Sequence, residues 1–109
     1  MPKNKETENK MQQLQVLEQN IQNVSMQKQQ FQSQLIELDS SLSEVEMAKG
    51  KTYKVIGAIM IESNKENIKK DLKDRREVVN LRIKTIEKQE DNLKEKAQSL
   101  QKEVLEGLK

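Results

Sequence analysis

The sequence of 109 residues contains no cysteine and no histidine, and it has only one proline, three glycines and two aromatic residues. Without cysteine or histidine, the chain can form no disulfide, no thiolate or imidazole metal site and no imidazole base. A Gly-rich phosphate-binding loop is missing as well. We therefore expect a protein that is not an enzyme and that needs no metal and no cofactor.

Long apolar runs are also missing from the sequence. No segment approaches the ~18 consecutive apolar residues of a membrane-spanning helix. The first ten residues lack the apolar stretch of a signal peptide. Because a chain without cysteine also suits a reducing compartment, we expect a cytoplasmic protein that makes no contact with membranes.

Charged residues make up 35% of the chain and hydrophobic residues 33%. This is too little apolar mass for a thick globular core, but it suits a coiled coil, in which two positions in seven are buried. The net charge of +2 comes from 20 basic and 18 acidic residues. Because acidic residues interrupt the basic run from Lys65 to Arg76, we interpret that run as a solvated helix face. The less favoured alternative is that this run binds the phosphate groups of a nucleic acid.

A first arm, which begins near Met11, carries a regular heptad pattern, whereas residues 1–8 are polar and expected to fray. Nine of the ten core positions of this arm are apolar, which is typical of a coiled-coil seam. These positions are Leu14, Leu17, Ile21, Val24, Lys28, Phe31, Leu35, Leu38, Leu42 and Val45.

A second arm begins at Ser63, where Ser63 and Glu66 have the spacing of a capping box with Ser63 as the N-cap. The two arms match as an antiparallel pair when residues whose numbers sum to 114 face each other, so that Leu17 meets Ala97. The core positions of the second arm are Leu72, Arg76, Val79, Ile83, Ile86, Glu90, Leu93, Ala97, Leu100, Val104 and Gly107.

Between the arms lies a block of β-forming residues centred on Gly57, which predicts a strand hairpin over residues 50–63. Two strands alone are only marginally stable in water. Both expected faces are apolar, so we expect hairpins from other subunits to complete this one. The expected faces are Tyr53, Val55, Ile59 and Ile61 on one side, and Ile56, Ala58 and Met60 on the other.

The sequence thus predicts a mainly α fold in a single domain, residues 1–109. A long antiparallel two-helix coiled coil, with helices at 1–49 and 64–109, is joined by the β-hairpin at 50–63. Within the seam, Lys28 and Glu90 fall in adjacent layers on opposite helices. They either extend outwards independently or form an interhelical ion pair that fixes the register.

Three stretches together resemble the beta class of the prefoldin family, in its archaeal form, over roughly residues 11–105. They are Met26–Gln30 in the first arm, Tyr53–Ile61 in the hairpin and Leu81–Glu90 in the second arm. The resemblance implies an ATP-independent chaperone hexamer of two alpha-type and four beta-type subunits. It also implies that the hairpins form a β-barrel body, from which six coiled coils extend. Their tips would capture unfolded proteins and pass them to a group II chaperonin.

Apolar residues outside the seam and near the open end of the arms are Met11, Val16, Leu105 and Leu108. An exposed apolar patch there is a binding surface, although incidental apolar residues at fraying helix ends would look the same. With the resemblance added, we expect the client-binding tip to comprise Met11, Leu14, Val16, Leu17, Leu100, Val104, Leu105 and Leu108. We expect the oligomerisation surface to comprise Tyr53, Val55, Ile56, Gly57, Ile59, Met60 and Ile61. The alternative function is a structural spacer or tether without general chaperone activity.

Overall fold

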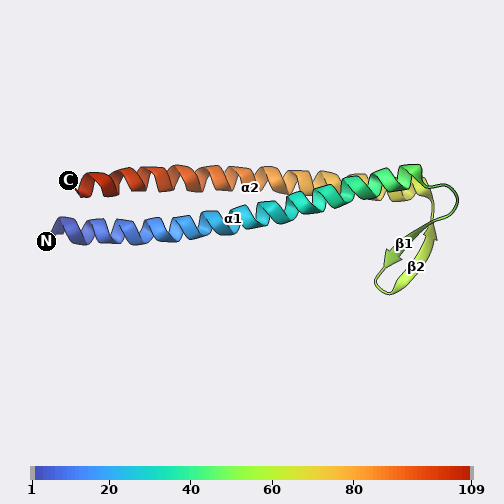
Figure 1. Ribbon diagram of the computed structural model, residues 1–109, viewed down its shortest axis with the longest axis horizontal. Helices are drawn as coiled ribbons and strands as arrows, with labels where there is room; N and C mark the ends of the chain where they lie inside the picture. Colours follow the sequence, from blue (N-terminus) through green and yellow to red (C-terminus); the bar gives the residue numbers. More distant parts are fainter. Residues whose placement is uncertain (1, 109) are drawn as a thin grey trace. The chain divides into compact units, whose positions relative to one another are not determined.

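The computed structural model describes residues 2–108 of the chain, and side chains from residue 5 onwards. Its elements in chain order are helix α1, Pro2–Met47, strand β1, Thr52–Ile56, strand β2, Ile59–Ser63, and helix α2, Lys65–Gly107 (Figure 1). The predicted fold of two long antiparallel helices joined by a two-stranded hairpin is therefore confirmed. Within residues 2–108, neither helix has a segment apolar enough to cross a membrane.

The described chain divides into two compact units. The terminal unit comprises residues 2–29 of α1 and 84–108 of α2, which run side by side so that the start of α1 and the end of α2 lie at the same end of the unit (Figure 1). The hairpin unit comprises residues 30–83, and it contains the rest of both helices together with β1 and β2.

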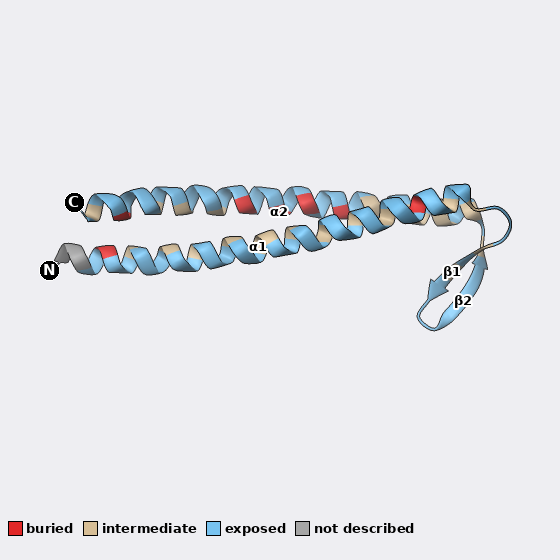
Figure 2. Cartoon of the chain, in the orientation of Figure 1, coloured by how far each residue is buried: buried red, intermediate tan, exposed pale blue. Residues whose placement is uncertain are grey.

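In both units the predicted seam is the core. Every predicted core position of the two arms is buried or half-buried, and these positions lie on the facing sides of the helices (Figure 2). The most deeply covered apolar side chains are Leu42, Val79 and Ile83 in the hairpin unit, and Ile86 and Val104 in the terminal unit. Burial of this single stripe, and not intrinsic propensity alone, makes such long helices stable.

The start of α1 differs from the expectation. Residues 1–8 were expected to fray, but the helix begins at Pro2, and Thr7 is only 6% exposed. Proline is well tolerated in the first turn of a helix, because its missing N–H would have no intrahelical partner there. Thr7 is covered because it packs against Gly107 of α2.

The end of α1 is capped by a side chain from α2. The Lys65 ammonium donates hydrogen bonds to the carbonyl oxygens of Glu46, at 2.8 Å, and Ala48, at 3.3 Å. The last carbonyls of a helix have no intrahelical donor and carry partial negative charge, so a cation there is favourable. Gly50 follows with a φ of 93°, a left-handed conformation that glycine adopts at low cost and that turns the chain towards β1.

The cap of α2 was assigned to the wrong residue. Ser63 is the last residue of β2, and its carbonyl accepts the Thr52 hydroxyl at 2.6 Å. The N-cap is Asn64, whose side-chain oxygen accepts the backbone N–H of Glu66 at 2.8 Å. Asparagine caps helices as well as serine does. Ser63 can therefore belong to β2 while α2 still has a capping residue.

The hairpin turn is also displaced from the expected centre. Ile56 pairs with Ile59, which leaves Gly57 and Ala58 as a two-residue turn. Gly57 has a φ of 59°, and no residue other than glycine has a positive φ in residues 2–108. A positive φ at the first turn residue alone is typical of a type II′ turn, which favours glycine at that position.

This turn changes which residues share a face of the hairpin. Directly opposed residues of an antiparallel pair point to the same side, and Val55 opposes Met60 while Lys54 opposes Ile61. The expected grouping was therefore wrong for the second strand, although both faces remain apolar. One face carries Tyr53, Val55 and Met60, and the other carries Ile56, Ile59 and Ile61.

Candidate functional site

The hairpin is the largest concentration of exposed apolar side chains in the hairpin unit. Its six large apolar residues are between 47% and 67% exposed, whereas the helices beside it show a buried stripe (Figure 2). Two-stranded sheets with exposed apolar faces and open edges bind further strands readily. All seven residues predicted for oligomerisation are exposed: Tyr53, Val55, Ile56, Gly57, Ile59, Met60 and Ile61.

Polar contacts hold the hairpin against the helices of its unit. Lys54 of β1 forms an ion pair with Asp71 of α2 at 3.2 Å, and Asp71 also pairs with Arg75 at 3.3 Å. The Lys65 cap in addition joins the start of α2 to the end of α1, the two helix ends from which the hairpin extends. The apolar faces are thus presented by an anchored element, which reduces the ordering cost of association.

The residues predicted for client binding all lie in the terminal unit, but the structure divides them by exposure. Met11 is 44% exposed, Val16 59%, Leu105 58% and Leu108 66%, so these four are accessible. Leu14, Leu17 and Leu100 are half-buried in the seam. Val104 is 7% exposed and is not accessible in this conformation.

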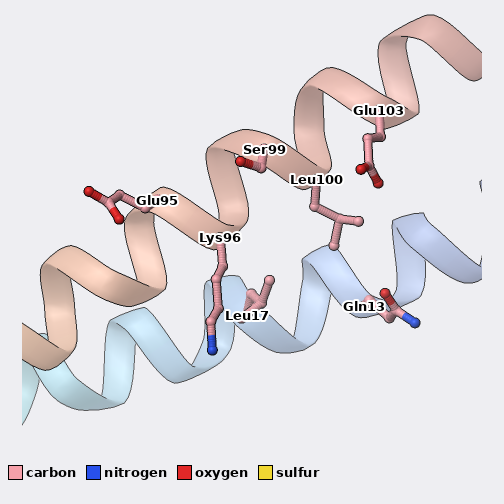
Figure 3. A pocket seen from close by; sticks show the side chains of 7 residues that line it. All are labelled: Gln13, Leu17, Glu95, Lys96, Ser99, Leu100 and Glu103. Carbon is pink, nitrogen blue, oxygen red and sulfur yellow. The ribbon is translucent and has the colours of Figure 1, made fainter.

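A groove of about 460 Å³ lies between the two helices of the terminal unit. Leu17 and Leu100 point towards each other across it, and Lys96 extends from α2 towards α1 (Figure 3). A second hollow on α1 shares Gln13 and Leu17 with this groove. The groove thus has an apolar floor, formed by Leu17 and Leu100, and a polar rim. The rim residues Gln13, Glu95, Lys96, Ser99 and Glu103 were not predicted, because such residues are ordinary on any helix surface.

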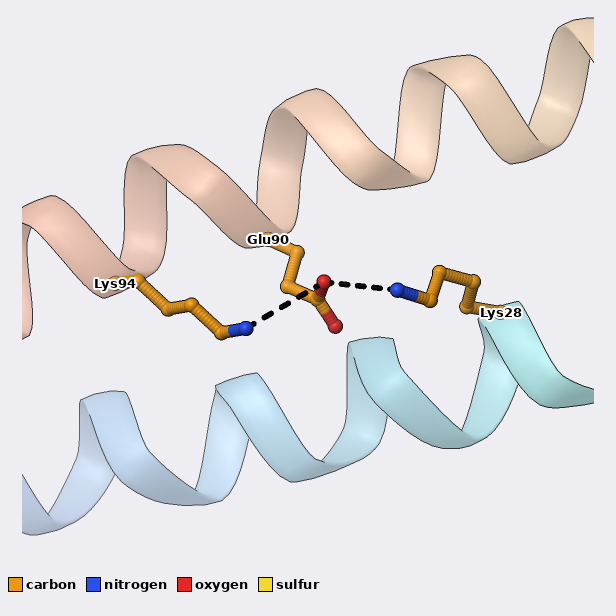
Figure 4. Close-up of polar contacts among 3 residues, drawn as sticks. All are labelled: Lys28, Glu90 and Lys94. Atoms are coloured by element: carbon orange, nitrogen blue, oxygen red, sulfur yellow. Dashed lines mark hydrogen bonds and ion pairs between the residues drawn. The ribbon is translucent and has the colours of Figure 1, made fainter.

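The seam of the terminal unit contains a layer of charge. Lys28 Nζ lies 3.0 Å from Glu90 Oε1, and Lys94 Nζ lies 3.6 Å from the same oxygen (Figure 4). The Glu90 side chain is only 8% exposed and that of Lys28 is 25% exposed. The sequence left open whether these residues pair, and the structure shows the interhelical ion pair. A comparable contact in the hairpin unit joins Arg76 to Asp39 at 3.2 Å.

Both pKa values in this layer move in the direction that keeps the charges. The hydrogen bond from Lys28 lowers the pKa of Glu90 below its ordinary value of 4.5, against an opposing effect of burial. The same hydrogen bond raises the pKa of Lys28 above 10.5. At neutral pH both groups are therefore charged, and the pair contributes its full stabilisation. That contribution is lost as the pH falls through the folded-state pKa of Glu90 or rises through that of Lys28.

We expect Lys28→Leu to lower the melting temperature more than Glu90→Leu does. The first substitution leaves a carboxylate in the seam with Lys94 alone as its partner, whereas the second leaves a lysine that can extend into solvent. The double variant should melt at least as high as the wild type, because leucine fits a core position. Thermal unfolding followed by circular dichroism measures these differences. Equal losses in the two single variants would contradict the asymmetry.

Comparison with known proteins supports the family that the sequence resembled. Residues 8–109 match the family described as "Prefoldin subunit". Prefoldin subunit beta of Pyrobaculum calidifontis is 34% identical over 86 residues, which cover 77% of this chain and 69% of that protein. Prefoldin subunit beta of Archaeoglobus fulgidus is 32% identical over 101 residues, covering 91% and 87% respectively.

The fold leads to the same family. The crystal structure of the prefoldin beta subunit from Thermococcus strain KS-1 aligns with a TM-score of 0.91 at 28% identity. The alignment covers 95% of this chain and 93% of that one, so it includes the hairpin as well as both helices. A coiled coil alone would be common to many proteins, but equal arms around an exposed hairpin are not. This chain therefore belongs to the prefoldin family of non-enzymatic chaperones, as a beta subunit.

Proposed function

We propose that this subunit is part of an ATP-independent holdase, which captures unfolded proteins at the ends of its paired helices and delivers them to a group II chaperonin. The observation that carries the proposal is the exposure of Met11, Val16, Leu105 and Leu108 in the terminal unit. Unfolded chains expose apolar side chains, and burying these against an apolar surface is favourable in water. Methionine also adapts its flexible side chain to varied partners.

Assembly would take place through the hairpin. The partners would be a prefoldin alpha-type subunit and further beta subunits, two alpha and four beta in one complex, with the hairpins closing a β-barrel body. Support comes from the two apolar faces of the hairpin, which carry Val55 with Met60 and Ile56 with Ile59. A closed barrel removes the open strand edges and covers these side chains together.

Several subunits in one complex would make weak contacts effective. Near its open end each terminal unit offers four exposed apolar side chains and a small groove, which is enough for a weak and adaptable contact. When several such sites are tethered, each further contact is intramolecular and the overall affinity rises steeply. Release to a chaperonin would then need only successive loss of single contacts, with no hydrolysis.

The second candidate function is a structural spacer or tether. Long regular helices with a covered seam favour it, because they set a distance between fixed partners. A tether binds defined partners through specific contacts and has no affinity for unrelated unfolded chains. The two functions therefore differ in the breadth of what they bind.

We expect the complex reconstituted with its alpha-type partner to suppress the aggregation of several unrelated denatured proteins in the absence of ATP. Light scattering after dilution from denaturant measures this, and an equal mass of an inert protein is the control. A tether would leave the scattering curves of all test proteins unchanged. Suppression confined to one protein would likewise contradict a general holdase and favour a dedicated partner.

A further inference from the structure

The end of the terminal unit contains a contact that the predicted register aligns, since the numbers of Thr7 and Gly107 sum to 114, but whose closeness the heptad pattern does not predict. Gly107 occupies a core position of α2, and Thr7 of α1 lies against it. Thr7 is only 6% exposed although its side chain is polar. A Cβ atom built on Gly107 would overlap Thr7 Oγ1, and it would lie 3.5 Å from both Thr7 Cβ and Thr7 Cγ2. A residue larger than glycine at this position would therefore require Thr7 to shift.

Glycine at this place is unfavourable for the helix itself. It loses more conformational entropy on folding than alanine does, and it offers no side chain to the seam. Thr7 packs closely into the space left by the missing Cβ. We call the packing of Thr7 against Gly107 the end contact.

Neighbouring contacts close the same end of the terminal unit. Val104, one turn before Gly107, is 7% exposed. Lys10 of α1 forms an ion pair with Glu103 of α2 at 3.5 Å, and it also lies 3.8 Å from Glu6. The two helix ends are thus held together by apolar burial, one ion pair and the end contact. Without these, terminal turns would separate at low cost.

We propose that the end contact keeps the ends of α1 and α2 together and thereby limits the apolar surface offered to a client. In the closed form a client meets the exposed side chains, such as Met11 and Leu108, whereas Val104 stays covered. Separation of the ends would add Val104 and more of Leu14 and Leu100 to the surface. This inference rests on the proposed client binding in the terminal unit, and it concerns how that binding is restrained.

The test begins with Gly107→Ala, which places a methyl group in overlap with Thr7 Oγ1. Because overpacking a close contact forces the elements apart, we expect the open population to rise about tenfold, or about 1.4 kcal/mol. Spin labels on cysteines introduced at the exposed residues Gln12 and Lys102 report the separation of the ends. Labels at Asn23 and Asp91, farther along the terminal unit, should show an unchanged distance.

A compensating variant separates the contact from other effects of the substitution. Thr7→Ala removes Oγ1 and Cγ2 and leaves a Cβ at 3.5 Å, an ordinary contact distance, from the new methyl group. The double variant Thr7→Ala/Gly107→Ala should therefore return to the closed distance, although it keeps the higher helix propensity of alanine. Gln101→Ala, on the exposed face of α2, is the matched control and should change nothing.

The functional readout is the amount of assembled complex needed to suppress aggregation of a denatured test protein. Gly107→Ala should lower that amount, and the double variant should restore it. The inference is overturned if Gly107→Ala leaves the label distances unchanged, or if the ends separate and the amount of complex stays the same. Failure of the proposed function is a separate result, seen when removal of the exposed apolar side chains of this unit leaves client holding intact.

Discussion

Replacing Ile59 and Ile61 with lysine is expected to release this prefoldin beta subunit from its complex while its helices stay folded. The two side chains lie on the same face of the hairpin as Ile56, and they are 62% and 47% exposed in the single chain. Covering an isoleucine contributes about 1.5–3 kcal/mol, and two buried ammonium groups would add an electrostatic cost. Each 1.4 kcal/mol is tenfold in affinity, so we expect the dissociation constant to rise by at least about 100-fold.

Sedimentation velocity of the variant mixed with its partner subunit measures this loss, and circular dichroism confirms that helix is retained. A matched control places the same two charges on exposed apolar residues of α1, as Met26→Lys/Ile36→Lys. These side chains are 60% and 69% exposed and lie outside the hairpin, so the control should assemble normally. A full-sized complex formed by the hairpin variant would show that assembly uses another surface.

The second large effect is expected from replacing Met11, Val16, Leu105 and Leu108 together with glutamine. Each side chain is at least 44% exposed, so the fold should change little. Client binding should fall strongly, because every copy of this subunit in the complex makes weaker contacts and avidity multiplies the losses. We expect at least about tenfold more complex to be needed for the same suppression of aggregation, equivalent to about 1.4 kcal/mol.

The control for this variant removes the same number of exposed apolar side chains elsewhere. Met26, Ile36, Met47 and Val78 are 48–71% exposed and lie outside the predicted tip, and each is changed to glutamine. Aggregation of a denatured test protein, followed by light scattering, should be suppressed normally by this control. If both variants lose activity equally, clients bind along the helices in general and the tip proposal is wrong.

Much of the fold could be predicted because its signals are local and repeated. The core positions of a heptad are covered in any two-helix coiled coil, whatever residue occupies them. Residues as different as Lys28, Phe31 and Gly107 were therefore all placed correctly in the seam. Hairpin existence followed from a block of β-branched residues around a glycine. The grouping of residues on its two faces could not be predicted in the same way. That grouping depends on whether Gly57 is the central residue of the turn or the first of two turn residues. A displacement of half a residue exchanges the faces of one strand.

Other features depended on three-dimensional contacts that a pattern cannot contain. Residues 2–8 look like a frayed end in the sequence, because the close packing of Thr7 against Gly107 is visible only in the structure. The sequence could align Lys28 with Glu90, but only side-chain geometry decides between an ion pair and two solvated charges. The exposed tip residues were predicted by subtraction, as apolar residues that the seam leaves over. Val104 was included in the expected tip although the heptad pattern placed it in the seam, and the structure shows it covered there.

The exposed hairpin has a consequence for the production of the subunit in a cell. A newly made chain whose hairpin is still uncovered presents two open strand edges and two apolar faces, the features that promote association with other unpaired strands. Such a chain is itself prone to aggregate for as long as it waits for partners. Balanced synthesis of the subunits would shorten that time. A copy left without partners would keep its apolar hairpin exposed, and exposed apolar surface is what quality-control proteins recognise in incomplete proteins.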